Sequence, residues 1–332
     1  MIREAADRRS GANGVLAVTI LLLFASMAIA VSTGAVNLGP ARVFDGLFDR
    51  GDTVARQIVW QLRVPRVLVA AFVGANLSVA GVLLQGVTRN PLAGPHILGL
   101  SAGAGFASIT VVVVAPGTPI ELIAPAAFLG AIAAALVVYG LAWRGGISPV
   151  RFALSGVATA ALFTAMSTAV LANSDLFTQR VLSFLAGGLF ARDWDDAYQI
   201  MPYSLVLGAV ALLVAGALNV MALGDDVARG LGMQVERMRL LLVVLAAGLT
   251  GSAVAVSGML AFVGLVVPHA ARLLVGSDHR RAAPVAALLG ASLLVLADTL
   301  SRIVIAPAEI PVGIVTAVIG APVFLLLIRT RT

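Results

Sequence analysis

Few side chains in this sequence have the chemistry of a catalytic or metal-binding group. The chain holds three histidines, His96, His269 and His279, and no cysteine. A zinc site needs three or four ligands, and His269 has only Arg272 one helical turn away. All 22 basic residues are arginine, so the Gly-x-x-x-x-Gly-Lys-Ser/Thr loop that binds nucleotide phosphates is absent. The sequence therefore predicts no catalytic residue, no metal site and no cofactor bound by this chain.

A group of polar residues lies inside one apolar stretch. Asn76, Ser78 and Gln85 fall among the 22 uncharged residues between Arg66 and Arg89. Polar side chains within a membrane span either line a transport path or form hydrogen bonds to a neighbouring helix. Both interpretations stay open for each of the three residues.

The segment 224–233 carries the clearest local signal. Two acidic residues near its start favour a helix N-terminus, and two glycines near its end favour an early stop. Val227 and Leu231 are four residues apart and share one helical face. The segment predicts a short helix whose apolar ridge fits a groove on a partner protein, the alternative being a plain polar connector. Its residues are Gly224, Asp225, Asp226, Val227, Ala228, Arg229, Gly230, Leu231, Gly232 and Met233.

Long apolar stretches must position these groups. The 332 residues are 60% hydrophobic and only 11% charged, whereas an average soluble domain is about 25% charged. Because about 20 apolar residues cross the hydrocarbon core of a bilayer, the sequence predicts an all-α membrane protein with ten transmembrane helices. No Asp, Glu, Lys or Arg falls at a predicted span centre, which argues against a proton relay inside the membrane. The predicted spans lie near residues 15–36, 67–88, 97–115, 122–143, 152–174, 199–221, 240–257, 261–275, 284–301 and 312–328.

The positions of the arginines predict which side of the membrane each loop faces. With ten spans both termini share one side, which collects 14 arginines against 8 on the other. By the positive-inside rule that side, with both termini, is cytoplasmic. A cleaved signal peptide is the alternative for the first span, but its apolar run exceeds the usual length. The net charge of +6 comes with no basic cluster, so nucleic acid is not an expected partner.

Two halves of five spans would have opposite orientations, the inverted-repeat plan of many transporters. Two Pro-His pairs at predicted inner ends, Pro95-His96 and Pro268-His269, agree with this plan. On the outer side, residues 53–62 predict a short amphipathic helix lying on the membrane surface. The outer stretch 173–196 is too short to cross, and we expect a short gate helix over Phe184 to Phe190.

Several sequence blocks occur together from about residue 63 onward. They are Arg63-Val-Pro-Arg66, Arg89-Asn-Pro-Leu-Ala-Gly-Pro95, Phe262-Val-Gly-Leu-Val-Val-Pro-His269, Ala297-Asp-Thr-Leu-Ser-Arg302 and Glu309-Ile-Pro-Val-Gly313. With these blocks the chain resembles a known family, the FecCD/BtuC-type permeases of ABC importers. These are the membrane subunits of importers for ferric siderophores, haem and cobalamin, and the Gly-Gly-Leu-Phe-Ala-Arg-Asp-Trp run over 187–194 resembles the subunits for ferric citrate and siderophores.

The resemblance implies one permease domain over residues 1–332 in the bacterial inner membrane, moving an iron(III) chelate into the cell. A loop at about 222–237 would hold the coupling helix that docks on a cytoplasmic ATPase, which binds ATP and Mg²⁺. Arg63, Arg66 and Arg302 would dock a periplasmic binding protein, although the residues alone also fit helix-end side chains that reach lipid headgroups. A second permease subunit completes the assembly. The alternatives are a haem or cobalamin permease of the same family and an ion-coupled secondary transporter.

Overall fold

The computed structural model describes residues 2–34, 38–48, 53–115, 117–119, 122–144, 148–172, 185–306 and 308–329. These residues form helices and include no β-strand, which confirms the all-α prediction. Seven helices are long and apolar enough to cross a membrane, and three further apolar helices are shorter. In chain order the helices are α1 (Ile2–Ser32), α2 (Pro40–Leu47), α3 (Thr53–Gln57), the π-helical η1 (Ile58–Arg63), α4 (Val64–Thr88), α5 (Leu100–Val114), α6 (Ile123–Ala142), α7 (Pro149–Ala172), α9 (Trp194–Val214), α10 (Gly216–Met221), α11 (Asp225–Gly230), α12 (Val235–Ser257), α13 (Val263–Val275), α14 (His279–Ile303) and α15 (Val312–Arg329).

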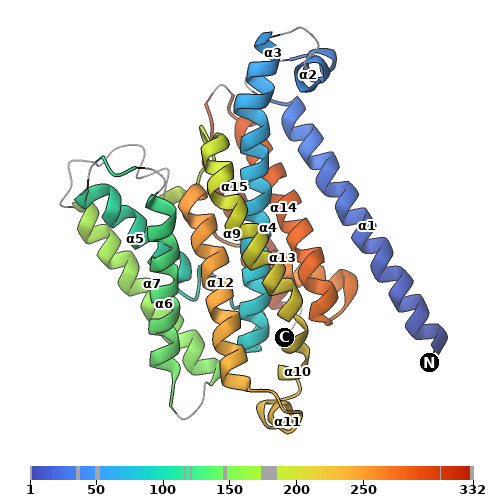
Figure 1. Cartoon of the computed structure of the whole chain (residues 1–332), viewed down its shortest axis with the longest axis vertical. Helices are drawn as coiled ribbons and strands as arrows, with labels where there is room; N and C mark the ends of the chain where they lie inside the picture. Colours follow the sequence, from blue (N-terminus) through green and yellow to red (C-terminus); the bar gives the residue numbers. More distant parts are fainter. Residues whose placement is uncertain are drawn as a thin grey trace.

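Helix α4 runs through the middle of the bundle (Figure 1). It packs against α14, α12, α9 and α13, and 78% of its most apolar window is buried. Helix α1 is the opposite case, because only 17% of its window is buried. It lies along one flank and packs mainly on α14. A shift of α4 therefore alters its packing against most of the bundle, whereas a shift of α1 alters mainly its packing against α14.

Glycines let the backbone of α4 approach its neighbours closely. A Cβ atom added at Gly81 would lie 1.9 Å from the carbonyl oxygen of Gly264 on α13, and one added at Gly74 would lie 2.1 Å from that of Gly290 on α14. Small residues allow such close approach between membrane helices, which associate by packing rather than by a hydrophobic driving force. These two contacts fix α4 against both neighbours.

The two ends of the bundle carry different elements. Helix α11 lies at one end, which we call the α11 end, and α2 and α3 lie at the opposite end, which we call the α2 end (Figure 1). The C-terminus of α4 and the N-terminus of α12 both lie at the α11 end, where Arg89 and Arg239 contact Asp225. The predicted docking arginines lie at the α2 end.

The expected surface helix over residues 53–62 is wrong. Helix α3, η1 and α4 follow one another without a break and form one candidate span, Thr53–Thr88. The π-helical turns of η1 connect α3 to α4 without a break in the helix. Val59 is buried, and the ring of Trp60 stacks on that of Trp194, with 6.1 Å between the centroids. The segment is therefore the end of the central helix.

The expected gate helix over Phe184 to Phe190 lies partly outside the described residues, which exclude 173–184, and the helix is wrong for 187–190, because only 185–186 is helical in the described part. Its described part packs on the bundle, since the N–H of Gly313 donates to the carbonyl of Gly187 at 3.0 Å and the N–H of Gly188 donates to Ser257 at 2.8 Å. The gate role stays a prediction.

Candidate functional site

Helix α11 forms where the acidic and glycine pattern predicts a short helix. It spans Asp225–Gly230 and is flanked by Gly224, at φ +111°, and Gly232, at φ +83°. Both backbone conformations are left-handed and favour glycine. The predicted early end of the helix is confirmed.

The apolar ridge of α11 points away from the bundle. Val227 is 50% exposed and Leu231 is 66% exposed, while Ala228 on the other face is buried. Leu223, just before the helix, is also exposed. Exposed apolar side chains grouped on one helical face are typical of a surface that binds a partner. The coupling role of this ridge stays a prediction.

An ion cluster, made of Arg89, Asp225, Glu236 and Arg239, ties α11 to the bundle. Arg239 Nη2 donates to Asp225 Oδ2 at 2.8 Å, and its Nη1 donates to Glu236 at 2.9 Å. Arg89 Nη2 pairs with the other oxygen of Asp225 and donates to the carbonyl of Met221 at 2.6 Å. One carboxylate thus joins α11 to the end of α4 and the start of α12. We call this group the α11 ion cluster.

The α11 ion cluster holds Asp225 ionised. Burial alone would raise the pKa of Asp225, but the hydrogen bond from Arg239 and the charges of Arg239 and Arg89 lower it below its ordinary value of 3.8. Arg89 itself has φ +48°, a left-handed conformation that is uncommon outside glycine, asparagine and aspartate. The backbone turn at the end of α4 thus aims this guanidinium at α11.

Asn76 lies buried where α4 meets two other helices. Its side-chain nitrogen donates to Ser204 Oγ on α9 at 2.8 Å and to Ser252 Oγ on α12 at 3.1 Å. Ser78, also on α4, is fully buried, and a Cβ atom at Gly290 would lie 1.9 Å from its hydroxyl. Both residues serve helix packing in this conformation, and their role in lining a path stays a prediction.

Gln85 is buried between α4 and α13. Its side-chain nitrogen donates to the carbonyl of Leu265 at 3.1 Å, and its oxygen accepts from Arg272 Nη2 at 2.5 Å. Arg272 therefore pairs with a residue of α4, 187 positions away in the sequence. For Gln85, too, the path-lining role stays a prediction.

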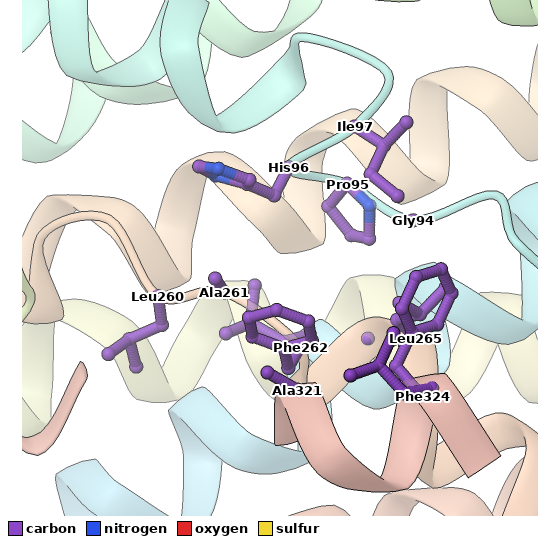
Figure 2. A pocket seen from close by; sticks show the side chains of 13 residues that line it. Gly94, Pro95, His96, Ile97, Leu260, Ala261, Phe262, Leu265, Ala321 and Phe324 are labelled. Carbon is purple, nitrogen blue, oxygen red and sulfur yellow. The ribbon is translucent and has the colours of Figure 1, made fainter. Parts of the chain in front are cut away.

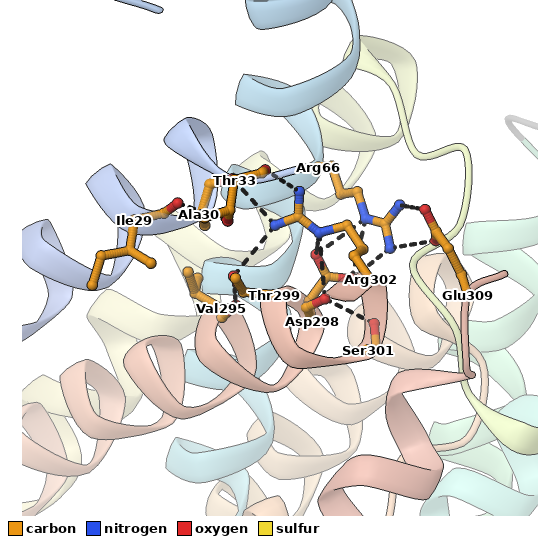
Figure 3. Close-up of polar contacts among 10 residues, drawn as sticks. All are labelled: Ile29, Ala30, Thr33, Arg66, Val295, Asp298, Thr299, Ser301, Arg302 and Glu309. Carbon is orange, nitrogen blue, oxygen red and sulfur yellow. Dashed lines mark hydrogen bonds and ion pairs between the residues drawn. The ribbon is translucent and has the colours of Figure 1, made fainter. Parts of the chain in front are cut away.

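Arg66 forms a buried ion pair network at the α2 end (Figure 3). Its Nη2 lies 2.8 Å from Asp298 Oδ1 and 2.9 Å from Glu309 Oε2, and its Nε donates to both oxygens of Asp298 at 3.1 Å. The side chain of Asp298 is 1% exposed and that of Glu309 is 21% exposed. Arg302 adds an ion pair to Asp298 at 3.2 Å. We call these four residues, with Arg63, the outer arginine cluster, after the side of the membrane that the sequence predicts for them.

Arg63 and Arg302 bind the end of α1. The last carbonyl groups of a helix have no partner within it, and cations are favoured beside them. The guanidinium groups of Arg63, on η1, and Arg302, on α14, supply these partners. Both elements therefore hold the C-terminal end of α1. The four hydrogen bonds run from Arg63 Nη1 to the carbonyls of Val31 (2.7 Å) and Ser32 (3.1 Å), and from Arg302 to those of Thr33 (3.0 Å) and Ala30 (3.2 Å).

The structure thus brings the three predicted docking arginines together. Arg63, Arg66 and Arg302 are 5%, 9% and 6% exposed, and all three bind groups of this chain. The sequence did not predict these partners, since Asp298 and Glu309 lie more than 230 positions from Arg66. Docking of a binding protein by these arginines stays a prediction.

An apolar cavity of about 390 Å³ lies between α13, α15 and the loop after α4 (Figure 2). Phe262 and Phe324 form one wall, with ring centroids 6.4 Å apart, and His96 lies on the other side. Among the described residues no group of three histidine or acidic side chains is placed to hold a metal.

Known proteins are similar to this chain over nearly its whole length. The FecCD transport family matches residues 20–330. The Fe(3+)-citrate import system permease protein YfmD of Bacillus subtilis is 39% identical over 98% of this chain and 98% of its own length. The Fe(3+) dicitrate transport system permease protein FecD of Escherichia coli is 40% identical over 82% of this chain and 86% of its own.

A solved structure shares the fold. It is an inward-facing conformation of a metal-chelate type ABC transporter, with a TM-score of 0.85 and 29% sequence identity, and it covers 96% of this chain and 99% of that one. This chain, with the helices, the α11 segment and the arginine motifs described above, therefore belongs to the FecCD transport family.

Proposed function

We propose that this chain is the membrane permease of an ATP-driven importer that moves an iron(III) chelate across the bacterial inner membrane. Full-length similarity to ferric citrate permeases supports the reaction class and the cargo. The observation that carries the proposal is the exposed ridge of α11, which is tied through Asp225 to the central helix α4.

The ridge is the docking surface for a separate ATPase, which binds ATP and Mg²⁺. Val227 and Leu231 enter a groove of the ATPase, and the α11 ion cluster passes the motion of α11 to α4 and α12. Because interfaces of packed helices switch between discrete arrangements, a small shift at α11 is enough to change the state of the bundle.

The experiment is co-purification of the ATPase with the permease in detergent. Leu231→Asp combined with Gly232→Pro removes the ridge, and we expect it to abolish association while the permease keeps its yield. Leu92→Asp is the matched control, because Leu92 is an exposed loop leucine at the same end. Normal co-purification of the ridge variant would overturn the assignment.

The helices support a bundle of ten spans with both termini in the cytoplasm and inverted five-helix halves. Seven long helices and three shorter apolar ones correspond to the ten apolar stretches of the sequence. The chain has no native cysteine, so single cysteines can report the topology. We expect Asp226→Cys to react from the cytoplasmic side and Phe48→Cys from the periplasmic side, and same-side labelling would contradict the topology.

The outer arginine cluster is the proposed docking site for acidic residues of a periplasmic binding protein. The cluster itself combines three guanidinium groups with two carboxylates and so carries a net positive charge. We expect Arg63→Gln and Arg302→Gln to weaken binding-protein affinity most at low salt, because dissolved ions screen the long-range attraction between opposite charges. Unchanged affinity at low salt in folded variants would remove these residues from the docking site.

The cargo is the least constrained part of the proposal. A cobalamin import system permease of Halobacterium salinarum is 42% identical over 83% of this chain, so cobalamin and haem are the alternatives within the family. Uptake assays with labelled ferric citrate, a ferric siderophore, haem and cobalamin separate them. A second permease subunit, identical or different, completes the assembly. Uptake that persists without any ATPase would favour an ion-coupled carrier.

A further inference from the structure

A second cavity, of about 350 Å³, lies between α1 and α14 at the α11 end. Helix α14 begins at this end, where the Asp278 side chain caps it and the backbone N–H of His279 donates to Asn219 Oδ1 of α10 at 2.9 Å. The other end of α1 is held by Arg63 and Arg302, as described above. The residues that line the cavity include Ala12, Asn13 and Leu16 of α1 and Arg280, Arg281 and Val285 of α14.

The lining of this cavity is amphipathic. Arg280, Arg281 and Asn13 offer hydrogen-bond donors, and the two arginines offer positive charge. Leu16 and Val285 supply apolar walls one turn further along each helix. A ligand that fits both parts carries an anionic head and an apolar chain.

The depth of the cavity in the bilayer points to the same ligand. The two apolar stretches on these helices begin near residues 15 and 284 of the sequence, so Asn13, Arg280 and Arg281 lie just before them and Leu16 and Val285 just inside them. Spans begin where hydrocarbon gives way to headgroups. Basic pockets between transmembrane helices at this level suit anionic phospholipid headgroups.

The side chain of Arg280 packs against the backbone of α10 at Gly216. A Cβ atom at Gly216 would lie 2.5 Å from Arg280 Nε, so glycine at this position makes room for the guanidinium. The carboxylate of Asp278 faces the same turn, but it accepts from Asn219 at 2.6 Å and from the backbone N–H of Arg280 at 3.0 Å. An arginine fork binds phosphate through two parallel hydrogen bonds.

We propose that this cavity binds the phosphate of an anionic phospholipid, with an acyl chain lying along the groove between α1 and α14. The lipid fills the space between the two helices at the α11 end, while the outer arginine cluster holds them together at the α2 end. This site is independent of the ATPase, the binding protein and the cargo.

The test measures thermal unfolding of the delipidated permease in a non-ionic detergent, with added lipid as the ligand. We expect phosphatidylglycerol to raise the unfolding temperature, and phosphatidylcholine and inorganic phosphate to leave it unchanged. The double variant Arg280→Gln/Arg281→Gln should lower the affinity for phosphatidylglycerol by about tenfold or more, because each arginine near an anionic lipid contributes to binding. Arg144→Gln, an exposed arginine at the same end, should retain wild-type affinity.

Three results would overturn the proposal. Equal stabilisation by phosphatidylcholine would show a non-specific lipid effect, and equal stabilisation by phosphate would show a simple anion site. Unchanged phosphatidylglycerol affinity in the double variant would place the lipid elsewhere. Native mass spectrometry gives a second readout that does not depend on stability, and we expect the double variant to retain fewer phosphatidylglycerol molecules than wild type and Arg144→Gln.

Discussion

Arg66 and Asp298 are 232 positions apart in the sequence, yet Arg66 Nη2 lies 2.8 Å from Asp298 Oδ1 within the bundle. The pair joins the central helix α4 to α14 at the α2 end. Its side chains are 10% and 1% exposed, so both charges depend on each other and on Glu309 rather than on water. A buried ion pair adds little net stability compared with an apolar pair, but losing one partner leaves an uncompensated charge.

We therefore expect Arg66→Gln or Asp298→Asn to destabilise the permease strongly, by about 3–5 kcal/mol. Thermal or denaturant unfolding in detergent measures the loss. Arg229→Gln is the control, because Arg229 is half exposed, its nearer partner Asp226 is fully exposed, its other partner Glu236 lies 3.8 Å away, and exposed pairs contribute little. Equal losses in the buried and exposed variants would show that burial does not set the strength of the pair.

Replacing Arg302 should loosen the end of α1. Arg302→Met removes the donors to the carbonyls of Ala30 and Thr33, and unpaired carbonyls favour fraying of the last helical turn. Hydrogen exchange should become faster in residues 29–33, and in Arg192→Gln, a change at the same end, it should stay at the wild-type rate. An unchanged rate in Arg302→Met would mean that Arg63 and the packing on α14 hold the end of α1 without Arg302.

The α11 ion cluster should depend on pH only in strong acid. The folded pKa of Asp225 lies below its ordinary value of 3.8, so the stability from this carboxylate is present above pH 3.8 and is lost as the pH falls through the lower, folded pKa. A spin label on α11 should show constant mobility from neutral pH down to about pH 4.

Asp225→Asn should release α11 at every pH, because the amide carries no charge. Arg89→Asn should have a similar effect while keeping the left-handed turn, since asparagine tolerates that conformation. Label mobility that rises between pH 7 and 5 in wild type, or that stays low in Asp225→Asn, would contradict the role of the cluster.

Gly81→Ala should disrupt the contact of α4 with α13. The added methyl group would lie 1.9 Å from the carbonyl oxygen of Gly264, and overpacking of this kind costs about 1–3 kcal/mol, occasionally more. Gly208→Ala on α9 has open space and should be neutral or stabilising. Comparable unfolding temperatures for the two variants would refute the close approach.

The sequence predicts the helices well because apolar length and charge breaks decide membrane spans locally. The α11 segment is also local, since two acidic residues, two glycines and the Val227–Leu231 spacing define it. The contacts that the sequence did not predict join residues far apart in the chain. The partners of Arg66 come from segments far apart in the chain, and only helix packing brings Asp298 and Glu309 to it.

Residues 53–62 show a different limit. Their apolar spacing fits a surface helix as well as the end of a long span, and the continuous backbone through η1 decides between the two. The polar residues of α4 left two interpretations open for a similar reason. Asn76 and Gln85 form interhelical hydrogen bonds here, which no spacing within one helix could indicate.

The central claim is that α11 couples an ATPase to iron chelate import. The most direct measurement is uptake of labelled ferric citrate by liposomes that contain the permease, its ATPase and its binding protein, with and without internal ATP. We expect uptake to require ATP, to be abolished by Leu231→Asp and to be preserved in Leu92→Asp. Uptake without ATP, or full uptake in Leu231→Asp, would contradict the claim.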